Sequence, residues 1–174
     1  MLEVRAGTIE AASPGRLTGY AAVFNSEANI GDFSEVIRAG AFTRSLASDI
    51  NVRALYHHQG EALLGTTRSG TLKLREDSRG LKFDLSLPDT SHGRDLAILV
   101  DRGDVAGMSF GFRVAPGGDR WEQRGAQMVR ELLNVDLFEI TLTADPAYPD
   151  TEVAKRTMPH GKALSLHHLW FSTV

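Results

Sequence analysis

The sequence predicts a mainly β fold with peripheral helices (α+β), in which an antiparallel β-barrel carries two or three helices on its outside. Most apolar runs in the 174 residues are short and alternate with polar residues, as strands with one wet face do. Turn-forming residues are dense, with 17 glycines and 6 prolines. Few stretches space their apolar residues as a helix does, so strands are expected to dominate the fold.

The first third of the chain contains three expected strands and one short helix. Residues 17–24 (LTGYAAVF) and 33–37 (FSEVI) have the composition and length of strands. Residues 41–47 (AFTRSLA) place their apolar side chains at helical spacing, which predicts a short helix. Residues 52–56 (VRALY) predict a strand that runs straight into two histidines.

A series of hairpins is expected next, with strands at residues 63–67, 71–75 and 81–87. The segments between them contain SG and DSRG, and glycine in such turns is free to adopt positive φ. In the third strand (LKFDLSL) every second residue is apolar, so one face is buried and the other is wet.

The clearest expected helix is residues 91–102. Ser91 is expected to cap it by accepting a hydrogen bond from the backbone N–H of Arg94, and Gly103 to end it. The remaining expected strands are residues 108–114, 127–133 and 136–143.

Length and charge suit one domain, expected at residues 1–150, with a flexible or processed tail at 151–174. The net charge is −3 and the sequence predicts no basic surface, which argues against nucleic-acid binding. The absence of cysteine removes disulfides, thiolate zinc sites and cysteine nucleophiles. No run approaches the roughly 18 apolar residues of a membrane span, and the acidic N-terminus has no signal-peptide core, so a soluble intracellular protein is expected.

Ser109 is the first candidate for chemistry, inside the segment GMSFGF at residues 107–112. Glycines in a strand allow another backbone to approach closely. An acyl-transfer nucleophile needs that access, with backbone N–H groups nearby for an oxyanion. The alternative is a small residue packed against a neighbouring strand.

His57 and His58 form the second candidate site. Adjacent residues of a strand point to opposite faces, so only one of the two rings is expected to face a given site. Histidine ordinarily titrates near neutral pH and is the usual base for a serine hydroxyl. The alternative is one surface histidine and one hydrogen-bonded core histidine.

Glu139 is a carboxylate within the apolar strand DLFEITL. Alternation divides this strand into two faces, with Leu137, Glu139 and Thr141 on one and Phe138, Ile140 and Leu142 on the other. If the second face is buried, Glu139 faces either solvent or a site. At a site it could orient an imidazole, as the third member of a catalytic triad does.

No cofactor or metal is expected. His167 and His168 could bind a metal only weakly, because no cysteine accompanies them and carboxylates are poorly placed. The glycines match no phosphate-loop pattern.

Five short blocks fall in a recognisable order. They are GYAAVF at 19–24, EVIRAGAF at 35–42, LYHH at 55–58, GMSFGF at 107–112, and LFEITL at 137–142 with DPA at 145–147. In this order and spacing they resemble the prohead, or capsid-maturation, proteases of tailed bacteriophages. The resemblance spans roughly residues 17–150 and is specific because all five blocks occur together.

The resemblance implies a serine endopeptidase with a fold similar to the herpesvirus capsid proteases, a β-barrel ringed by helices. It also implies that Ser109 is the nucleophile and His58 the base, because alignment on the following LG places His58 at the family's histidine. The family usually has an acidic residue after this histidine, where this chain has Gln59. Glu139 matches the family's glutamate and is the implied third member, with His57 left as an alternative.

The resemblance further implies the biological role. The substrates would be the scaffold, or a scaffold-like segment of the major capsid protein, and the protease itself. Cleavage would take place in the host cytoplasm inside the immature prohead, with no cofactor, and the enzyme could act as a homo-oligomer.

Two other functional hypotheses remain at this point. The barrel could be catalytically silent and bind capsid protein as an assembly scaffold. More remotely, His57, His58 and a carboxylate could serve a metal-dependent hydrolase.

Overall fold

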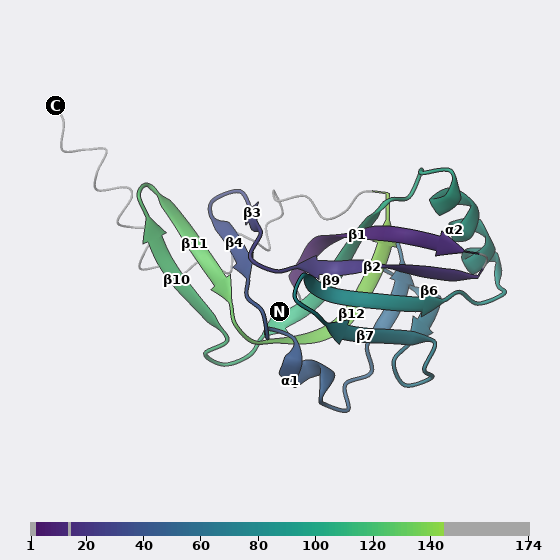
Figure 1. Cartoon of the computed structure of the whole chain (residues 1–174), viewed down its shortest axis with the longest axis horizontal. Helices are drawn as coiled ribbons and strands as arrows, with labels where there is room; N and C mark the ends of the chain where they lie inside the picture. The colour runs from purple at the N-terminus through teal and green to yellow at the C-terminus, as the bar shows by residue number, and fades with distance from the viewer. Residues whose placement is uncertain (1–2, 14, 145–174) are drawn as a thin grey trace.

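The computed structural model describes residues 3–13 and 15–144, and the expected tail at 151–174 lies outside them. Within these ranges the chain forms twelve strands and two helices. Eight strands make one large curved sheet and four make a smaller sheet beside it (Figure 1).

The large sheet is the barrel that the sequence predicts. In sheet order its strands are β6 (Gln59–Thr66), β5 (Arg53–Tyr56), β12 (Val135–Thr143), β9 (Gly107–Val114), β1 (Glu3–Ser13), β2 (Arg16–Val23), β8 (Gly80–Ser86) and β7 (Leu72–Glu76). All neighbours are antiparallel except β12 and β5, which run parallel. The two edge strands, β6 and β7, follow each other in the chain and contact each other, so the sheet nearly closes.

Gly65 allows the two edge strands of the barrel, β6 and β7, to come close together. A Cβ at Gly65 would lie 2.8 Å from both Leu85 Cδ1 and Thr71 Oγ1, closer than real Cβ atoms come. The backbone N–H of Thr66 donates to Thr71 Oγ1 at 3.0 Å and holds the turn between β6 and β7. A side chain at position 65 would force the edges apart.

Aromatic and aliphatic side chains on alternate strand positions fill the barrel. Phe83, Phe110 and Phe112 are fully buried. The ring of Phe110 lies 5.6 Å from that of Phe42 and 5.2 Å from that of Phe112. Burial of each such ring stabilises the fold by about 1.5–3 kcal/mol.

The helices are α1 (Thr43–Leu46) and α2 (Ser91–Asp101), at different sides of the barrel (Figure 1). The ring of helices implied by the resemblance is therefore wrong for the described part of the chain, which has only these two. Neither is long and apolar enough to cross a membrane.

The cap of α2 lies one residue before the expected one. Thr90, not Ser91, is the N-cap: its backbone is extended, and its hydroxyl accepts from the N–H of Gly93 at 3.3 Å. Ser91 already belongs to the first turn, where its own backbone is helical, so the preceding residue takes the capping role.

Three strands were not expected from the sequence: β1, β3 (Glu27–Asn29) and β10 (Asp119–Arg124). β1 (EVRAGTIEAAS) carries few large apolar residues, although it lies in the sheet between β9 and β2. β10 (DRWEQR) is an edge strand, where charged residues are common because they discourage pairing with another chain.

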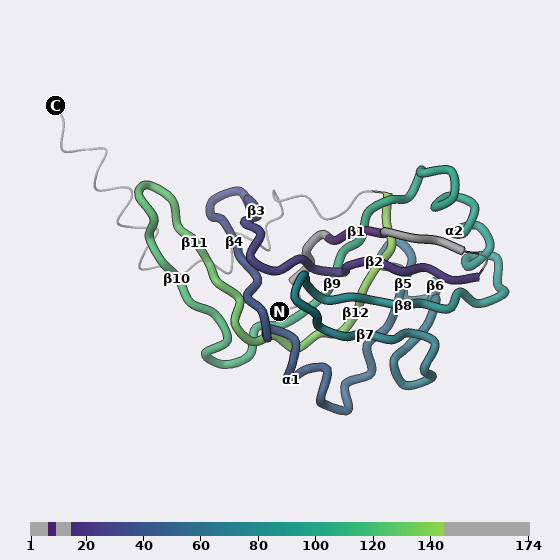
Figure 2. Tube along the Cα trace, viewed as in Figure 1, coloured from purple at the N-terminus to yellow at the C-terminus, as the bar shows by residue number. Residues whose placement is uncertain are grey.

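The small sheet has the order β10–β11–β4–β3, with β11 at Gln127–Leu132 and β4 at Ser34–Ile37. It stands away from the barrel, as the tube in Figure 2 shows. A separate apolar cluster supports it, in which the ring of Phe33 lies 4.8 Å from that of Trp121. All four residues of β4 are buried, so the strand is enclosed despite its short length.

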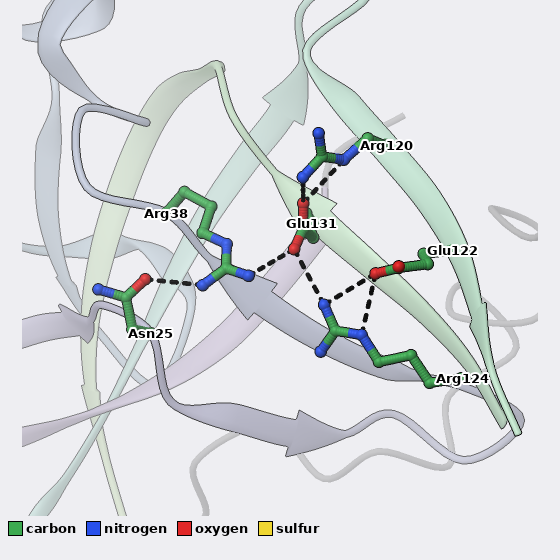
Figure 3. A network of polar contacts seen from close by, with 6 residues as sticks. All are labelled: Asn25, Arg38, Arg120, Glu122, Arg124 and Glu131. Atoms are coloured by element: carbon green, nitrogen blue, oxygen red, sulfur yellow. Dashed lines mark hydrogen bonds and ion pairs between the residues drawn. The ribbon is translucent and has the colours of Figure 1, made fainter.

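A buried carboxylate organises the face of the small sheet shown in Figure 3. Glu131 on β11 is 1% exposed and accepts bonds from Arg38, from Arg120 Nε at 2.9 Å and from Arg124 Nη2 at 3.2 Å. Arg38 Nη1 also donates to Asn25 Oδ1 at 2.9 Å, which links the small sheet to the end of β2. The hydrogen bonds from Arg38 and then Arg120 hold the pKa of Glu131 below its ordinary value.

We expect Glu131→Gln to lower the free energy of unfolding at pH 7 by about 1.5–3 kcal/mol, because charge-assisted bonds to arginine are lost. The folded-state pKa of Glu131 is lowered, so its contribution is complete above its ordinary pKa of 4.5 and is lost as the pH falls below that value. The gap between wild type and variant should therefore narrow when urea unfolding is repeated near pH 3.5.

Glu122→Gln is the matched control, since Glu122 also pairs with Arg124 but its side chain is 51% exposed. It should change the unfolding free energy by less than about 1 kcal/mol. A Glu131→Gln deficit that is the same at both pH values would contradict the assignment.

Candidate active site

The two histidines form the tight turn between β5 and β6. His57 and His58 both have positive φ, 50° and 58°, and Tyr56 pairs with Gln59 across the turn. This is the geometry of a type I′ hairpin turn, whose twist matches that of the flanking strands. The expectation that the histidines alternate along a strand is therefore wrong, because the chain reverses directly after Tyr56.

The turn sends the two rings to different residues of β12. His58 Nδ1 lies 2.9 Å from Glu139 Oε1, and His57 Nδ1 lies 3.2 Å from Thr143 Oγ1. The backbone N–H of His57 donates to the carbonyl of Leu142 at 3.1 Å and fastens the turn to that strand. His58 is therefore the histidine that pairs with the candidate carboxylate.

Glu139 is buried opposite a glycine. It faces Gly111 across the β12–β9 pair, and a Cβ on Gly111 would lie 2.8 Å from Glu139 Cγ. The absence of a side chain at Gly111 therefore makes the space that the carboxylate occupies.

A β-bulge changes the faces that strict alternation assigns to β12. The register slips between Leu137, which faces Phe112, and Glu139, which faces Gly111. As a result Leu137 joins the core with Ile140 and Leu142, and Phe138 stands outside with the guanidinium of Arg113 5.1 Å from its ring. The expected faces of Leu137 and Phe138 are thus exchanged, because the bulge inserts one residue.

Ser109 lies on the same face of the sheet as Glu139. It sits opposite Thr141 in the β12–β9 register, two residues before Gly111. Residues opposite each other, and residues two apart in one strand, point to the same side of a sheet. The structure thus places Ser109 on β9, next to β12, and Glu139 of β12 is the residue that contacts His58. Its neighbours Met108 and Phe110 point into the barrel core.

Two further residues of this face were missed by the sequence reasoning. Arg53 on β5 faces Glu139, and its Nη2 lies 3.3 Å from Oε2, the oxygen that His58 does not use. Thr141 lies between Glu139 and Thr143 along β12 and is fully buried. Alternation in DLFEITL places Thr141 with Glu139, but Arg53 joins them only through the parallel pairing of β5 and β12.

The arrangement suits proton transfer from a hydroxyl. With Nδ1 of His58 directed at Glu139, Nε2 is the ring nitrogen left to meet another group. Glu139 is held from both sides, by His58 on one oxygen and by Arg53 on the other. Ser109 is 0% exposed, so a peptide carbonyl reaches it only when the residues over this face give way.

In the part of the chain that the structure describes, these residues belong to no metal cluster, and they lie outside a groove on the barrel. Among the residues that the structure describes, no three His, Asp or Glu side chains converge to hold a metal ion. A groove of about 630 Å³ is lined by residues from 45–52 and from 67–74, and none of the candidate residues contributes to it.

A profile of the family described as caudovirus prohead serine protease matches residues 1–163. The chain belongs to this family. The resemblance carried by the five sequence blocks is thereby confirmed. A prohead protease of Enterobacteria phage HK97 is 38% identical over 104 residues, which cover 58% of this chain and 43% of that protein. The match thus spans less than half of the relative's length. No solved structure matches the chain.

We expect Gly111→Ala to destabilise the protein by about 1–3 kcal/mol, because the new methyl group would overlap Glu139 Cγ. The carboxylate would have to move away from His58. Urea unfolding measures the loss of stability. Gly60→Ala is the control, since a Cβ there meets nothing within 4 Å. Equal losses in the two variants would show that the space at Gly111 does not serve Glu139.

Proposed function

We propose that this chain is a serine endopeptidase of prohead maturation, with Ser109 as nucleophile, His58 as base and Glu139 as the third member. The observation that carries the proposal is the 2.9 Å contact between His58 Nδ1 and Glu139 Oε1, on the sheet face that also carries Ser109. Membership of the prohead serine protease family supports the choice of reaction.

In the proposed mechanism His58 Nε2 takes the proton of Ser109 Oγ while Oγ attacks a peptide carbonyl. The tetrahedral intermediate collapses, the C–N bond breaks, and the amine leaves with the proton from His58. Water, deprotonated by His58, then hydrolyses the acyl-enzyme. No metal or cofactor takes part.

Glu139 is proposed to hold the tautomer of His58 that carries its proton on Nδ1, and to stabilise the imidazolium that forms. Its burial supports this role, since a carboxylate with little water around it interacts more strongly with the ring. Arg53 takes the second carboxylate oxygen and limits its rotation.

The proposed substrates are the scaffold, or a scaffold-like segment of the major capsid protein, and the chain itself. The family's name supports the setting, which is the immature prohead in the host cytoplasm. Burial of Ser109 in the free chain is compatible with an enzyme whose site opens when it meets substrate at high local concentration, as a homo-oligomer or alone. Similarity to the herpesvirus capsid proteases stays a prediction.

We expect Ser109→Ala to abolish cleavage. The wild type and the variant are each expressed with the capsid precursor from the same genome, and intact masses of both proteins are measured. The wild type should shorten the precursor, itself, or both, and the variant should leave both at full length. Cleavage that persists in Ser109→Ala would contradict the assignment. Full-length products in both would support a silent scaffold.

The two histidines provide a matched pair of variants. His58→Ala should slow covalent labelling of Ser109 by a fluorophosphonate by roughly 10³-fold or more, because the base is lost. His57→Ala should retain most of the rate, since its ring contacts Thr143 instead of Glu139. The measurement is the labelling rate, with the label located by peptide mass spectrometry. A larger loss of labelling rate in His57→Ala than in His58→Ala would show that His57 is the base.

A further inference from the structure

The hydroxyl of Thr141 is buried without a hydrogen-bond partner. Among the residues that the structure describes, Thr141 Oγ1 is the one buried side-chain nitrogen or oxygen in this condition. Buried polar groups are nearly always paired, and an unpaired one destabilises the folded state. Threonine at this position therefore calls for an explanation other than stability.

The position of Thr141 points to its partner. Along one face of β12 lie Glu139, Thr141 and Thr143, two residues apart. The outer two bind the histidine turn, Glu139 through His58 and Thr143 through His57. The middle one faces Ser109 across the strand pair.

We propose that Thr141 donates a hydrogen bond from Oγ1 to the carbonyl oxygen of the substrate as that oxygen becomes negative, and so forms part of the oxyanion hole. This inference rests on the proposed function of Ser109. Directly opposed side chains have Cβ atoms about 4.5–5.5 Å apart. A carbonyl carbon bonded to Ser109 Oγ would therefore bring its oxygen within reach of the Thr141 hydroxyl.

The step needs no proton from threonine. As Ser109 Oγ bonds the carbonyl carbon, its proton passes to His58 and the π electron pair of the carbonyl moves onto oxygen. The Thr141 O–H donates to that oxygen and keeps its proton. When the carbonyl re-forms, the C–N bond breaks, the amine takes the proton from His58, and the hydrogen bond weakens.

The lack of a partner in the free protein favours this role. A donor that is already bonded must give up that bond before it can stabilise a transition state, whereas an unpartnered donor is available at once. Full burial also excludes bulk water, which strengthens the bond to a developing charge.

The test compares Thr141→Val with Thr141→Ser in the full chain. Valine keeps the shape and removes the hydroxyl, and serine keeps the hydroxyl. Thr141→Val should slow fluorophosphonate labelling of Ser109 by roughly 10²- to 10³-fold. Its Tm should nevertheless rise by roughly 2–4 °C, because an unpaired buried hydroxyl is gone. Thr141→Ser should keep most of the labelling rate.

The pH dependence of labelling separates donation to the oxyanion from support of His58. The midpoint of the rate profile should be the same in wild type and Thr141→Val, since the threonine does not titrate. A wild-type labelling rate in Thr141→Val, a lower Tm, or a shifted midpoint would overturn the inference and leave Ser109 as the nucleophile. Labelling is measured with the capsid precursor present, because Ser109 is buried in the free chain. Absence of labelling in folded wild type under this condition would overturn the proposed function and this inference together.

Discussion

The pairing of β12 with β9 is the constraint on which the candidate site depends. One slip of register, at the bulge between Leu137 and Glu139, decides which side chains share a face. Without it, Glu139 would lie opposite Phe110, whose side chain is in the barrel core. A bulge disrupts the ladder locally, and here the backbone N–H of Leu137 donates instead to the buried hydroxyl of Ser45 in α1, at 2.8 Å. The short helix thus supports the strand at the point where its register changes.

The parallel pairing of β5 with β12 adds the histidines. It sets Arg53 opposite Glu139 and brings the end of β5 level with Leu142, so that the turn falls over β12. That turn is made by two histidines with positive φ, a conformation that glycine or asparagine adopts more easily. Backbone strain of this kind costs about 1–3 kcal/mol for each residue and persists at sites where the side chain has a role.

Other residues of the candidate site also lower the stability of the fold. Glu139 is a buried carboxylate, Thr141 is a buried hydroxyl without a partner, and Gly111 leaves a strand position without a side chain to pack. Each feature weakens the fold locally. The barrel core of Phe83, Phe110 and Phe112, and the arginine network around Glu131, supply stability elsewhere.

By itself the sequence determined the strand-rich class, the hairpin of β7 with β8, both helices and the candidate residues Ser109, His57, His58 and Glu139. These follow from local patterns, either the alternation of apolar residues or short motifs within a strand. The hairpin expected between β6 and β7 does not form, because these strands are the two edges of the sheet. Strand β1 was not predicted because it contains few large apolar residues, although it lies inside the sheet between β9 and β2.

Only the tertiary structure decided that His58 contacts Glu139 and that Ser109 lies on the same face of the sheet. His58 and Glu139 are 81 positions apart in the chain, and the parallel register of β5 and β12 that joins them leaves no local trace in either segment. The choice between His57 and His58 depended on a turn that alternation misread, and the place of Thr141 opposite Ser109 depended on the bulge. Strand register is set by the sum of many contacts across the sheet, so a site built across three strands is specified by the whole fold.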